Sequence, residues 1–203
     1  IILFKQGQSS NLKKVFSHGE ENLYKAISRN WVMIALIVLT ILGFYIRFAP
    51  AVAPNFFEFD PYYYMRVTEF LVQKGVIPTY DDSAYYPMQE FHRLSPPAMH
   101  YMTGSWYLLY QWLLGLPYEK NVFIFVSQVY PALVGAFMVF LSYLLIKEEY
   151  GKYAGLAAGA LFAVTPQLVK KFAAGVSEQQ PFGLFLVLLV LAFYALAINR
   201  RSY

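Results

Sequence analysis

Long, mostly apolar runs alternate with short polar stretches along the chain. Four such runs cover residues 31–49, 122–146, 153–169 and 182–198. A helix rises about 1.5 Å per residue and the hydrocarbon layer of a membrane is about 30 Å thick, so each run is long enough, or nearly so, to cross it. The pattern therefore predicts an all-α, polytopic membrane protein.

A fifth apolar stretch, residues 98–116, differs from the others in its polar content. It contains His100, Thr103, Ser105 and Gln111 together with several tyrosine and tryptophan side chains. Such side chains favour the membrane interface over the hydrocarbon. We therefore predict an amphipathic helix that lies on, or partly in, the extracytoplasmic surface of the membrane.

Basic residues at both ends of the chain decide the predicted topology. The tail carries five lysine and arginine residues against Glu20 and Glu21, and Arg200 and Arg201 follow the last run. Basic segments beside spans stay in the cytoplasm, so the number of crossings must be even. We predict a multi-pass protein of the cell membrane with four spans, at about 31–49, 121–146, 152–169 and 181–198. The extracytoplasmic loops would be residues 50–119 and 170–180. The cytoplasmic segments would be residues 1–30 and 200–203.

The composition supports the membrane class and excludes several others. Hydrophobic residues make up 58% of the chain and charged residues only 14%, too little charge to cover a soluble domain. The net charge of +4 resides on basic residues that flank the spans, so it indicates topology and not nucleic-acid binding. The chain contains no cysteine, which excludes disulfides and cysteine-ligated metals within it.

An acidic segment at residues 58–61 is typical of a helix start. Asp60 suits the N-cap, Pro61 the first helical position, and Gly75 the end of the helix. A cap carboxylate keeps a second oxygen for a ligand, so Asp60 is either a cap alone or also a metal ligand. On the same helix, Arg66 is either a phosphate contact or a solvated side chain. The apolar positions that share one face at helical spacing are Tyr63, Tyr64, Val67, Phe70 and Leu71.

A second acidic segment, residues 177–181, precedes the fourth span. Glu178 is the only acidic residue after position 149, and a carboxylate so near lipid needs a partner, water or a cation. The predicted topology places it on the same side of the membrane as Asp60. Two such carboxylates form a hard oxygen site that suits Mg²⁺ or Mn²⁺, although an ordinary helix cap is the alternative for Glu178. Lys170 and Lys171 either anchor the third span or bind anionic phosphates.

The first acidic segment resembles the first-loop signature of the catalytic subunit of oligosaccharyltransferase, a membrane glycosyltransferase. The matching sequence is Glu58-Phe59-Asp60-Pro61-Tyr62-Tyr63-Tyr64-Met65-Arg66-Val67-Thr68-Glu69-Phe70-Leu71. The segment Tyr85-Tyr86-Pro87 and Arg93 are similar to the family's Tyr-Pro…Arg segment, and residues 166–180 to its second acidic motif. The resemblance covers about residues 31–199, and the pattern at 62–65 looks more archaeal than eukaryotic.

This resemblance implies a GT-C fold, a helical bundle whose large extracytoplasmic loops contain amphipathic helices. It implies Mn²⁺ or Mg²⁺ as cofactor. It also implies transfer of a glycan from a lipid-linked oligosaccharide donor to an acceptor polypeptide, at the asparagine of an Asn-x-Ser/Thr sequon. By position, Asp60 would be the catalytic residue and a metal ligand, with Glu178 and Gln180 as further ligands. Lys171, Arg66 and Arg93 would contact the donor phosphates.

The chain also departs from the family's pattern. Gln180 stands where the family has an acidic residue or histidine, and a neutral carbonyl oxygen is a weaker ligand. A glycine-rich stretch is replaced by residues 88–92, and the later acceptor-binding motif Trp-Trp-Asp-Tyr-Gly is absent. We therefore expect the N-terminal portion of an enzyme, inactive by itself.

Two other function classes are compatible with these residues. A related GT-C enzyme would transfer sugar from a lipid phosphate to protein hydroxyls or glycolipids, and it too would need an acidic residue such as Asp60. In a non-catalytic membrane subunit or transporter, the acidic residues would be caps and the basic residues anchors. The segment around Glu178 favours the transfer to asparagine.

Overall fold

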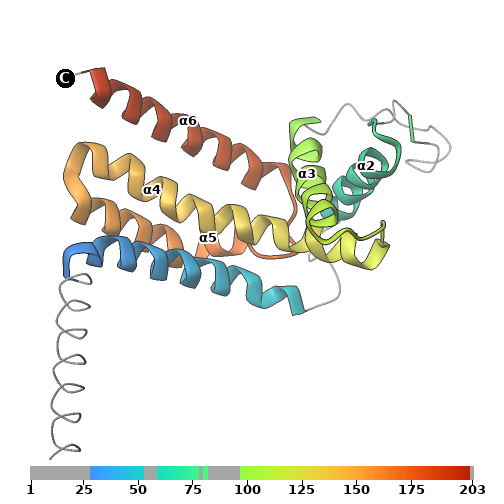
Figure 1. Ribbon diagram of the computed structural model, residues 1–203, viewed down its shortest axis with the longest axis horizontal. Coiled ribbons are helices and arrows are strands. Elements are labelled where there is room, and N and C mark those ends of the chain that lie inside the picture. Colours follow the sequence, from blue (N-terminus) through green and yellow to red (C-terminus); the bar gives the residue numbers. More distant parts are fainter. Residues whose placement is uncertain (1–27, 53–58, 78–79, 82–96, 202–203) are drawn as a thin grey trace, which may run out of the picture.

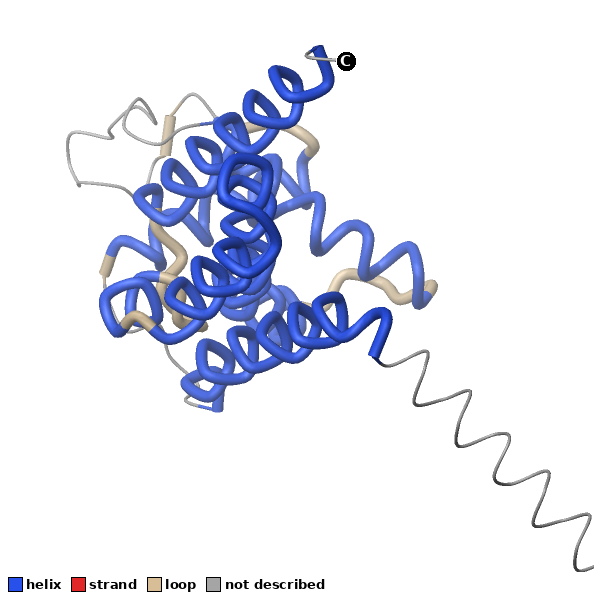
Figure 2. The backbone as a smooth tube through the Cα atoms, turned by 90° about the vertical axis from the view of Figure 1, so that its left-hand side faces the viewer, coloured by secondary structure: helices blue, strands red, loops and turns tan. Residues whose placement is uncertain are grey.

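The computed structural model describes residues 28–52, 59–77, 80–81 and 97–201, and within these ranges it is helical without a β-strand (Figure 2). This confirms the predicted all-α class. The helices are an N-terminal helix at residues 28–48, then η1 Ala49–Val52, α2 Asp60–Lys74, α3 Pro97–Leu114, α4 Lys120–Val164, α5 Pro166–Lys171 and α6 Gln179–Arg201.

The long helices run along one another as a bundle, and α2 and α3 pack together at one end of it (Figure 1). Three helices of the described residues are long and apolar enough to cross a membrane: Ser28–Ala51, Lys120–Val164 and Gln179–Ile198. Helix α3 is not among them, in agreement with the prediction that residues 98–116 do not form a span. Its buried residues, which face α2 or the bundle, are Met99, His100, Thr103, Gly104 and Tyr107.

Helix α4 consists of two arms that reverse direction at Gly151. This residue has φ 83° and ψ 171°, a conformation open to glycine but rarely to other residues. The arms then pack closely, because a Cβ at Gly155 would lie 2.8 Å from the carbonyl oxygen of Tyr143, and one at Gly159 would lie 3.3 Å from that of Val139. With this reversal the three long helices make four passes along the bundle (Figure 1).

The second arm of α4 is shorter than the expected span 152–169, because it ends at Val164. Thr165 has φ −60° and ψ 120°, outside helical geometry, and α5 begins at Pro166. Proline disfavours the helical conformation of the residue before it and offers no N–H to the preceding turn. The break is therefore a local consequence of Pro166.

Helix α2 ends as expected and begins one residue earlier. Gly75 adopts the left-handed conformation at φ 75°, and its N–H donates to the carbonyl oxygen of Leu71 at 2.8 Å. At the other end Phe59 occupies the cap position with helical dihedrals, so the prediction of Asp60 as the N-cap is wrong by one position. Asp60 lies in the first turn, where its charge still complements the helix dipole.

The four passes bring two distant loops to one end of the bundle. The N-terminal helix ends, and the first arm of α4 begins, at the end that carries α2 and α3. The second arm of α4 returns to this end, and α6 leaves from it (Figure 1). Asp60 and Glu178 therefore both lie at this end.

Candidate active site

Side chains from α2, α3 and α6 meet in one buried cluster at this end of the bundle. The cluster consists of Tyr64, Met99 and Phe182, which are 6%, 1% and 5% exposed. Tyr64 follows Asp60 by four residues on α2, about one helical turn, and Phe182 follows Glu178 by four residues. The cluster thus joins the two acidic segments that the sequence analysis singled out.

Both carboxylates act electrostatically on the Tyr64 hydroxyl. Burial raises its pKa above the ordinary value, and the negative charges of Asp60 and then Glu178 raise it further, with a smaller effect from Tyr63. A negative charge disfavours the phenolate and so raises the pKa of a phenol, and it does this only at short range. The two acids are therefore near the same side chain, although they are far apart in the sequence.

Residues 172–178 form the buried loop that carries Glu178. Gly175, with φ 90°, donates its N–H to the carbonyl oxygen of Gln128 at 2.9 Å. The Ser177 hydroxyl donates to the carbonyl oxygen of Ser127 at 2.7 Å. These bonds tie the loop to the first arm of α4, so the position of Glu178 is defined by the bundle itself.

The Glu178 carboxylate is 6% exposed and forms an ion pair with Lys171. The distance from Lys171 Nζ to Glu178 Oε2 is 3.4 Å, and 46% of the lysine side chain is exposed. A buried carboxylate needs such a partner, because the loss of hydration is costly. The structure thus brings together two of the residues that the sequence analysis proposed for the site.

The donor set at this end is made of oxygen atoms. Asp60 is exposed in the first turn of α2, and Gln180 is exposed in the first turn of α6. The described ranges contain no group of three or more His, Cys, Asp or Glu residues that could hold a metal. Two carboxylates and an amide oxygen fit a hard divalent cation in type, and the remaining ligands would be water or phosphate.

Arg66, another expected phosphate contact, is paired with a different carboxylate. The Arg66 guanidinium forms an ion pair with the buried carboxylate of Asp81. Arg66 also lines a pocket of about 290 Å³ together with Glu69, Phe70, Gln73 and Lys120. Arg93 lies outside the described residues.

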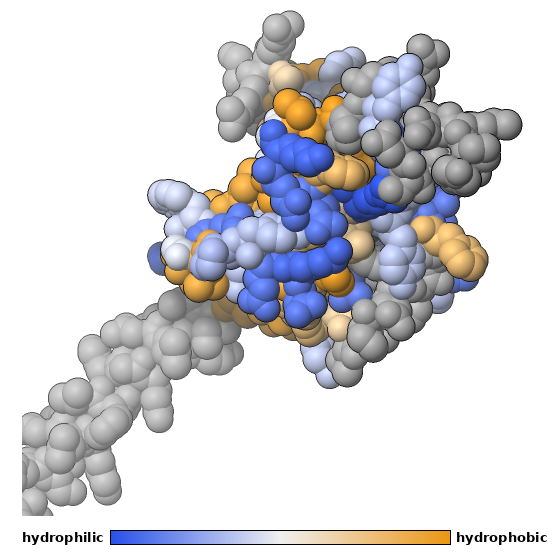
Figure 3. Space-filling model, turned by 90° about the vertical axis from the view of Figure 1, so that its right-hand side faces the viewer, coloured by the Kyte–Doolittle hydropathy of each residue, from blue (hydrophilic) through white to orange (hydrophobic). Residues whose placement is uncertain are grey.

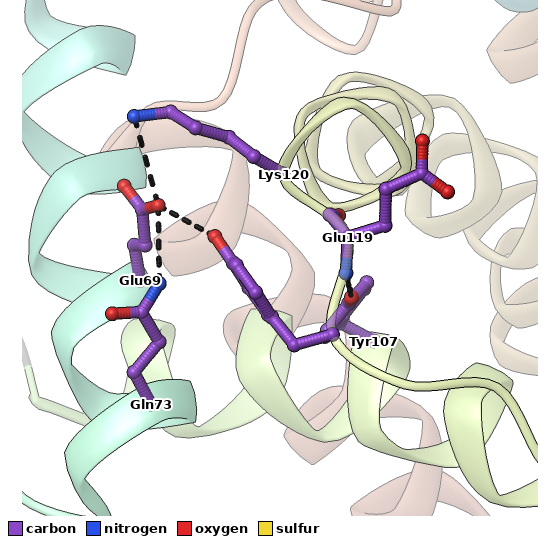
Figure 4. A network of polar contacts seen from close by, with 6 residues as sticks. Glu69, Gln73, Tyr107, Glu119 and Lys120 are labelled. Atoms are coloured by element: carbon purple, nitrogen blue, oxygen red, sulfur yellow. Dashed lines mark hydrogen bonds and ion pairs between the residues drawn. The ribbon is translucent and has the colours of Figure 1, made fainter.

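A polar network that the sequence analysis did not identify joins α2 to the start of α4 (Figure 4). The Glu69 carboxylate accepts a hydrogen bond of 2.5 Å from the Tyr118 hydroxyl and lies 3.8 Å from Lys120 Nζ. The Tyr107 hydroxyl accepts from the backbone N–H of Glu119 at 3.0 Å. The sequence signal was weak, because these residues are spread over α2, α3 and the loop before α4.

Hydrophilic side chains gather over the same end of the molecule. Figure 3 looks onto the α2–α3 end and shows a polar area bordered by hydrophobic side chains. The flanks of the bundle, by contrast, expose large apolar side chains such as Ile37, Val38, Val187 and Val190. This division is typical of a membrane protein with its chemistry at one water-facing end.

These observations define a helical, multi-pass membrane protein with two acidic segments, and a candidate site, at one end of its bundle. Residues 31–203 match the family model described as "Oligosaccharyl transferase STT3, N-terminal". The match covers more than half of the chain, so the chain belongs to this family.

Curated relatives from a plant and an archaeon are similar to this chain. The dolichyl-diphosphooligosaccharide–protein glycosyltransferase subunit STT3A of Oryza sativa subsp. japonica is 28% identical over 174 residues, and the match covers 82% of this chain and 22% of that protein. The dolichyl-phosphooligosaccharide-protein glycotransferase 2 of Archaeoglobus fulgidus is 27% identical over 172 residues, and the match covers 76% of this chain and 26% of that protein. The chain thus spans about a quarter of the length of these relatives.

Solved structures share the fold. The archaeal oligosaccharyltransferase AglB from Archaeoglobus fulgidus, in complex with an inhibitory peptide and a dolichol-phosphate, matches with a TM-score of 0.70 and 21% identity over 86% of this chain and 20% of that chain. A second crystal structure, of the Archaeoglobus fulgidus oligosaccharyltransferase complex with Zn and sulfate, matches with a TM-score of 0.71 and 21% identity over 82% and 21%. These matches support the predicted GT-C architecture.

Proposed function

We propose that this chain is the N-terminal membrane portion of an oligosaccharyltransferase that moves a glycan from a lipid-linked donor to asparagine in an Asn-x-Ser/Thr sequon. The observation that carries the proposal is the buried cluster of Tyr64, Met99 and Phe182, which joins the two acidic segments. The family supports the transfer reaction. We further propose an extracytoplasmic site, with the N-terminus in the cytoplasm.

Asp60 is the residue that meets the acceptor in this proposal. Its carboxylate is exposed at the start of α2, so a polypeptide can reach it. A carboxylate that accepts a hydrogen bond from the acceptor amide N–H increases electron density at the nitrogen that attacks the sugar. Asp60 therefore orients the asparagine side chain.

Glu178 and Lys171 act on the donor side. With Asp60, Glu178 holds Mn²⁺ or Mg²⁺, with Gln180 as a neutral third donor, and a bound cation would neutralise charge on the leaving phosphate. Lys171 is half exposed beside Glu178, so its ammonium group can also face a donor phosphate. Arg66 is already paired with Asp81, which leaves Lys171 as the stronger of the described candidates for this contact.

Isosteric substitutions in the full-length protein test the proposal. Asp60→Asn and Glu178→Gln remove one charge each and keep the side-chain shape. We expect transfer to an Asn-x-Thr peptide, measured at fixed Mn²⁺, to fall roughly 10²–10³-fold, the loss typical of removing one group that stabilises developing charge. The matched control is Glu119→Gln, because the Glu119 side chain is exposed and its recorded hydrogen bonds involve the backbone.

Two results would contradict the proposal. One is transfer that remains metal-dependent and equally fast in Asp60→Asn and Glu178→Gln. The other is transfer to a peptide that has serine or threonine but no asparagine, which would assign the chain to a hydroxyl-glycosylating enzyme of the same fold.

A further inference from the structure

The N-terminal helix carries an arginine, Arg47, whose side chain is completely buried in the bundle. Its Nη1 donates hydrogen bonds to the carbonyl oxygens of Gly43 and Ala163, at 2.9 and 3.0 Å. Its Nη2 donates to the carbonyl oxygen of Phe162 at 2.8 Å, and the guanidinium carbon lies 5.7 Å from the centre of the Phe162 ring. Two of its three recorded acceptors thus belong to the end of the second arm of α4.

The end of this arm needs donors from elsewhere. The second arm ends at Val164, and the N–H of Thr165 still donates to the carbonyl oxygen of Leu161 at 2.9 Å, but the carbonyl groups after Leu161 lie past this last helical bond. The carbonyl group of Phe162 cannot receive its usual bond from the residue four positions later, because that residue is Pro166 and has no N–H. In a membrane such a carbonyl group strongly destabilises the structure if it stays unpaired. Arg47 supplies the missing donors, and its positive charge complements the negative end of the helix dipole.

The backbone of Arg47 holds the Glu178 loop directly. The N–H of Ala174 donates to the carbonyl oxygen of Arg47 at 2.8 Å. Glu178 follows Ala174 by four positions, and most residues of this loop are buried. Arg47 therefore contacts the second arm of α4 with its side chain and the loop that carries Glu178 with its backbone.

Gly135, on the first arm of α4, supplies the space for this contact. A Cβ atom there would lie 2.6 Å from Arg47 Cδ and 2.7 Å from Phe172 Cβ. Phe172, the first residue of the loop, is completely buried, and its Cβ is bonded to the backbone, so relief of this contact requires a shift of the packed chain itself. A methyl group at position 135 would thus displace the Arg47 side chain and the backbone at the start of the loop.

We propose that Arg47 is a positioning residue for Glu178: together with the space at Gly135, it fixes the loop that presents this carboxylate to the metal and the donor. The effect on metal binding rests on the proposed function, whereas the effect on the loop does not. Arg47 does not touch the reacting groups, because its recorded contacts are with helix ends, with Phe162 and with the loop backbone.

A spin label next to Glu178 tests the effect on the loop without any enzyme assay. The chain contains no cysteine, so Gln179→Cys introduces a single labelling position at an exposed residue, once cysteines elsewhere in the full-length protein are replaced. We expect Arg47→Met and Gly135→Ala to increase the mobility of the nitroxide, and Arg47→Lys to lie closer to the parent because one ammonium group still reaches a carbonyl. The matched control is Gly159→Ala, which crowds the α4 arms at Val139 and not Arg47.

The metal dependence of transfer gives a second readout with the unlabelled variants. We expect Arg47→Met and Gly135→Ala to raise the Mn²⁺ concentration for half-maximal rate by about tenfold to a hundredfold, as for residues that orient metal ligands, and kcat at saturating Mn²⁺ to change by less than about threefold. A merely structural role would lower the amount of folded protein and kcat and leave the Mn²⁺ requirement of the folded fraction unchanged.

Unchanged label mobility in the folded Arg47→Met or Gly135→Ala protein would overturn the proposal. If Arg47→Met does not accumulate in the membrane, the label mobility of Gly135→Ala decides: an increase supports the proposal and an unchanged value overturns it. If the parent enzyme transfers glycan without a divalent cation, the proposed metal site fails, and increased label mobility would still establish that Arg47 positions the loop.

Discussion

Tyr64 on α2 and Phe182 on α6 pack in one buried cluster, although more than a hundred residues separate them. Tyr64 also lies within electrostatic range of both Asp60 and Glu178. This contact is what turns two separate acidic segments into a candidate site, so its loss should affect both stability and transfer.

Substitution of Tyr64 separates its packing from its hydroxyl group. Tyr64→Ala removes a buried aromatic ring, which typically costs about 3–5 kcal/mol, and it loosens α2 against α6. We expect a clear fall in the apparent Tm of the purified full-length protein and a large loss of transfer. Tyr64→Phe keeps the ring, so its Tm should stay close to that of the parent. Equal Tm values for the Ala and Phe variants would contradict the packing role.

Substitution of Lys171 changes the charge beside Glu178. Lys171→Gln removes the ammonium group 3.4 Å from the carboxylate. We expect Mn²⁺ to bind more tightly, by up to about fivefold given the exposure of the lysine, and the KM for the lipid-linked donor to rise. Isothermal titration with Mn²⁺ and initial-rate kinetics measure the two effects. Lys170→Gln is the matched control, and equal effects in the two variants would show that only the general surface charge matters.

The parts of the fold that depend on local chemistry could be predicted from the sequence. The end of α2 at Gly75, and the absence of α3 from the helices apolar enough to span a membrane, follow from helix signals and polar content that lie within one segment. The break at Thr165 was also readable, because Pro166 follows it, but the apolar run beyond it concealed the signal. Asp60 was misplaced by one position because the helical dihedrals of Phe59 are not visible in the sequence.

The parts of the site that depend on long-range contacts could not be predicted. Tyr64 reads as one more apolar position on an amphipathic helix, and nothing near it in the sequence indicates Phe182. Arg47 lies inside a predicted span, and two of the three carbonyl groups it binds are 115 and 116 residues away. Because backbone carbonyl groups are the same in every residue, no side-chain pattern could identify them as its partners.

The raised pKa of Tyr118 predicts a loss of folding stability at high pH. Burial and its hydrogen bond to Glu69 raise the pKa of Tyr118 to about 12. In the unfolded chain a tyrosine titrates near pH 10, so the stability that this group contributes is complete below about pH 10 and is lost as the pH rises through about 12. We expect the apparent Tm to fall across this window, and to fall less in Tyr118→Phe. The exposed Tyr101, changed to Phe, is the control, and an unaltered slope in Tyr118→Phe would refute the prediction.

Two adjacent glutamines at the start of α6 test whether position 180 is a metal ligand. Gln179 and Gln180 are both exposed in the first turn, so a negative charge at either position gains similarly from the helix dipole. If the Gln180 side chain is a ligand, Gln180→Glu adds a charged oxygen to the metal and should tighten Mn²⁺ binding by roughly tenfold, about 1.4 kcal/mol. Gln179→Glu should change it by much less. The difference between the two Kd values, measured by Mn²⁺ titration, isolates direct ligation from the general electrostatic effect, and equal values would remove Gln180 from the proposed site.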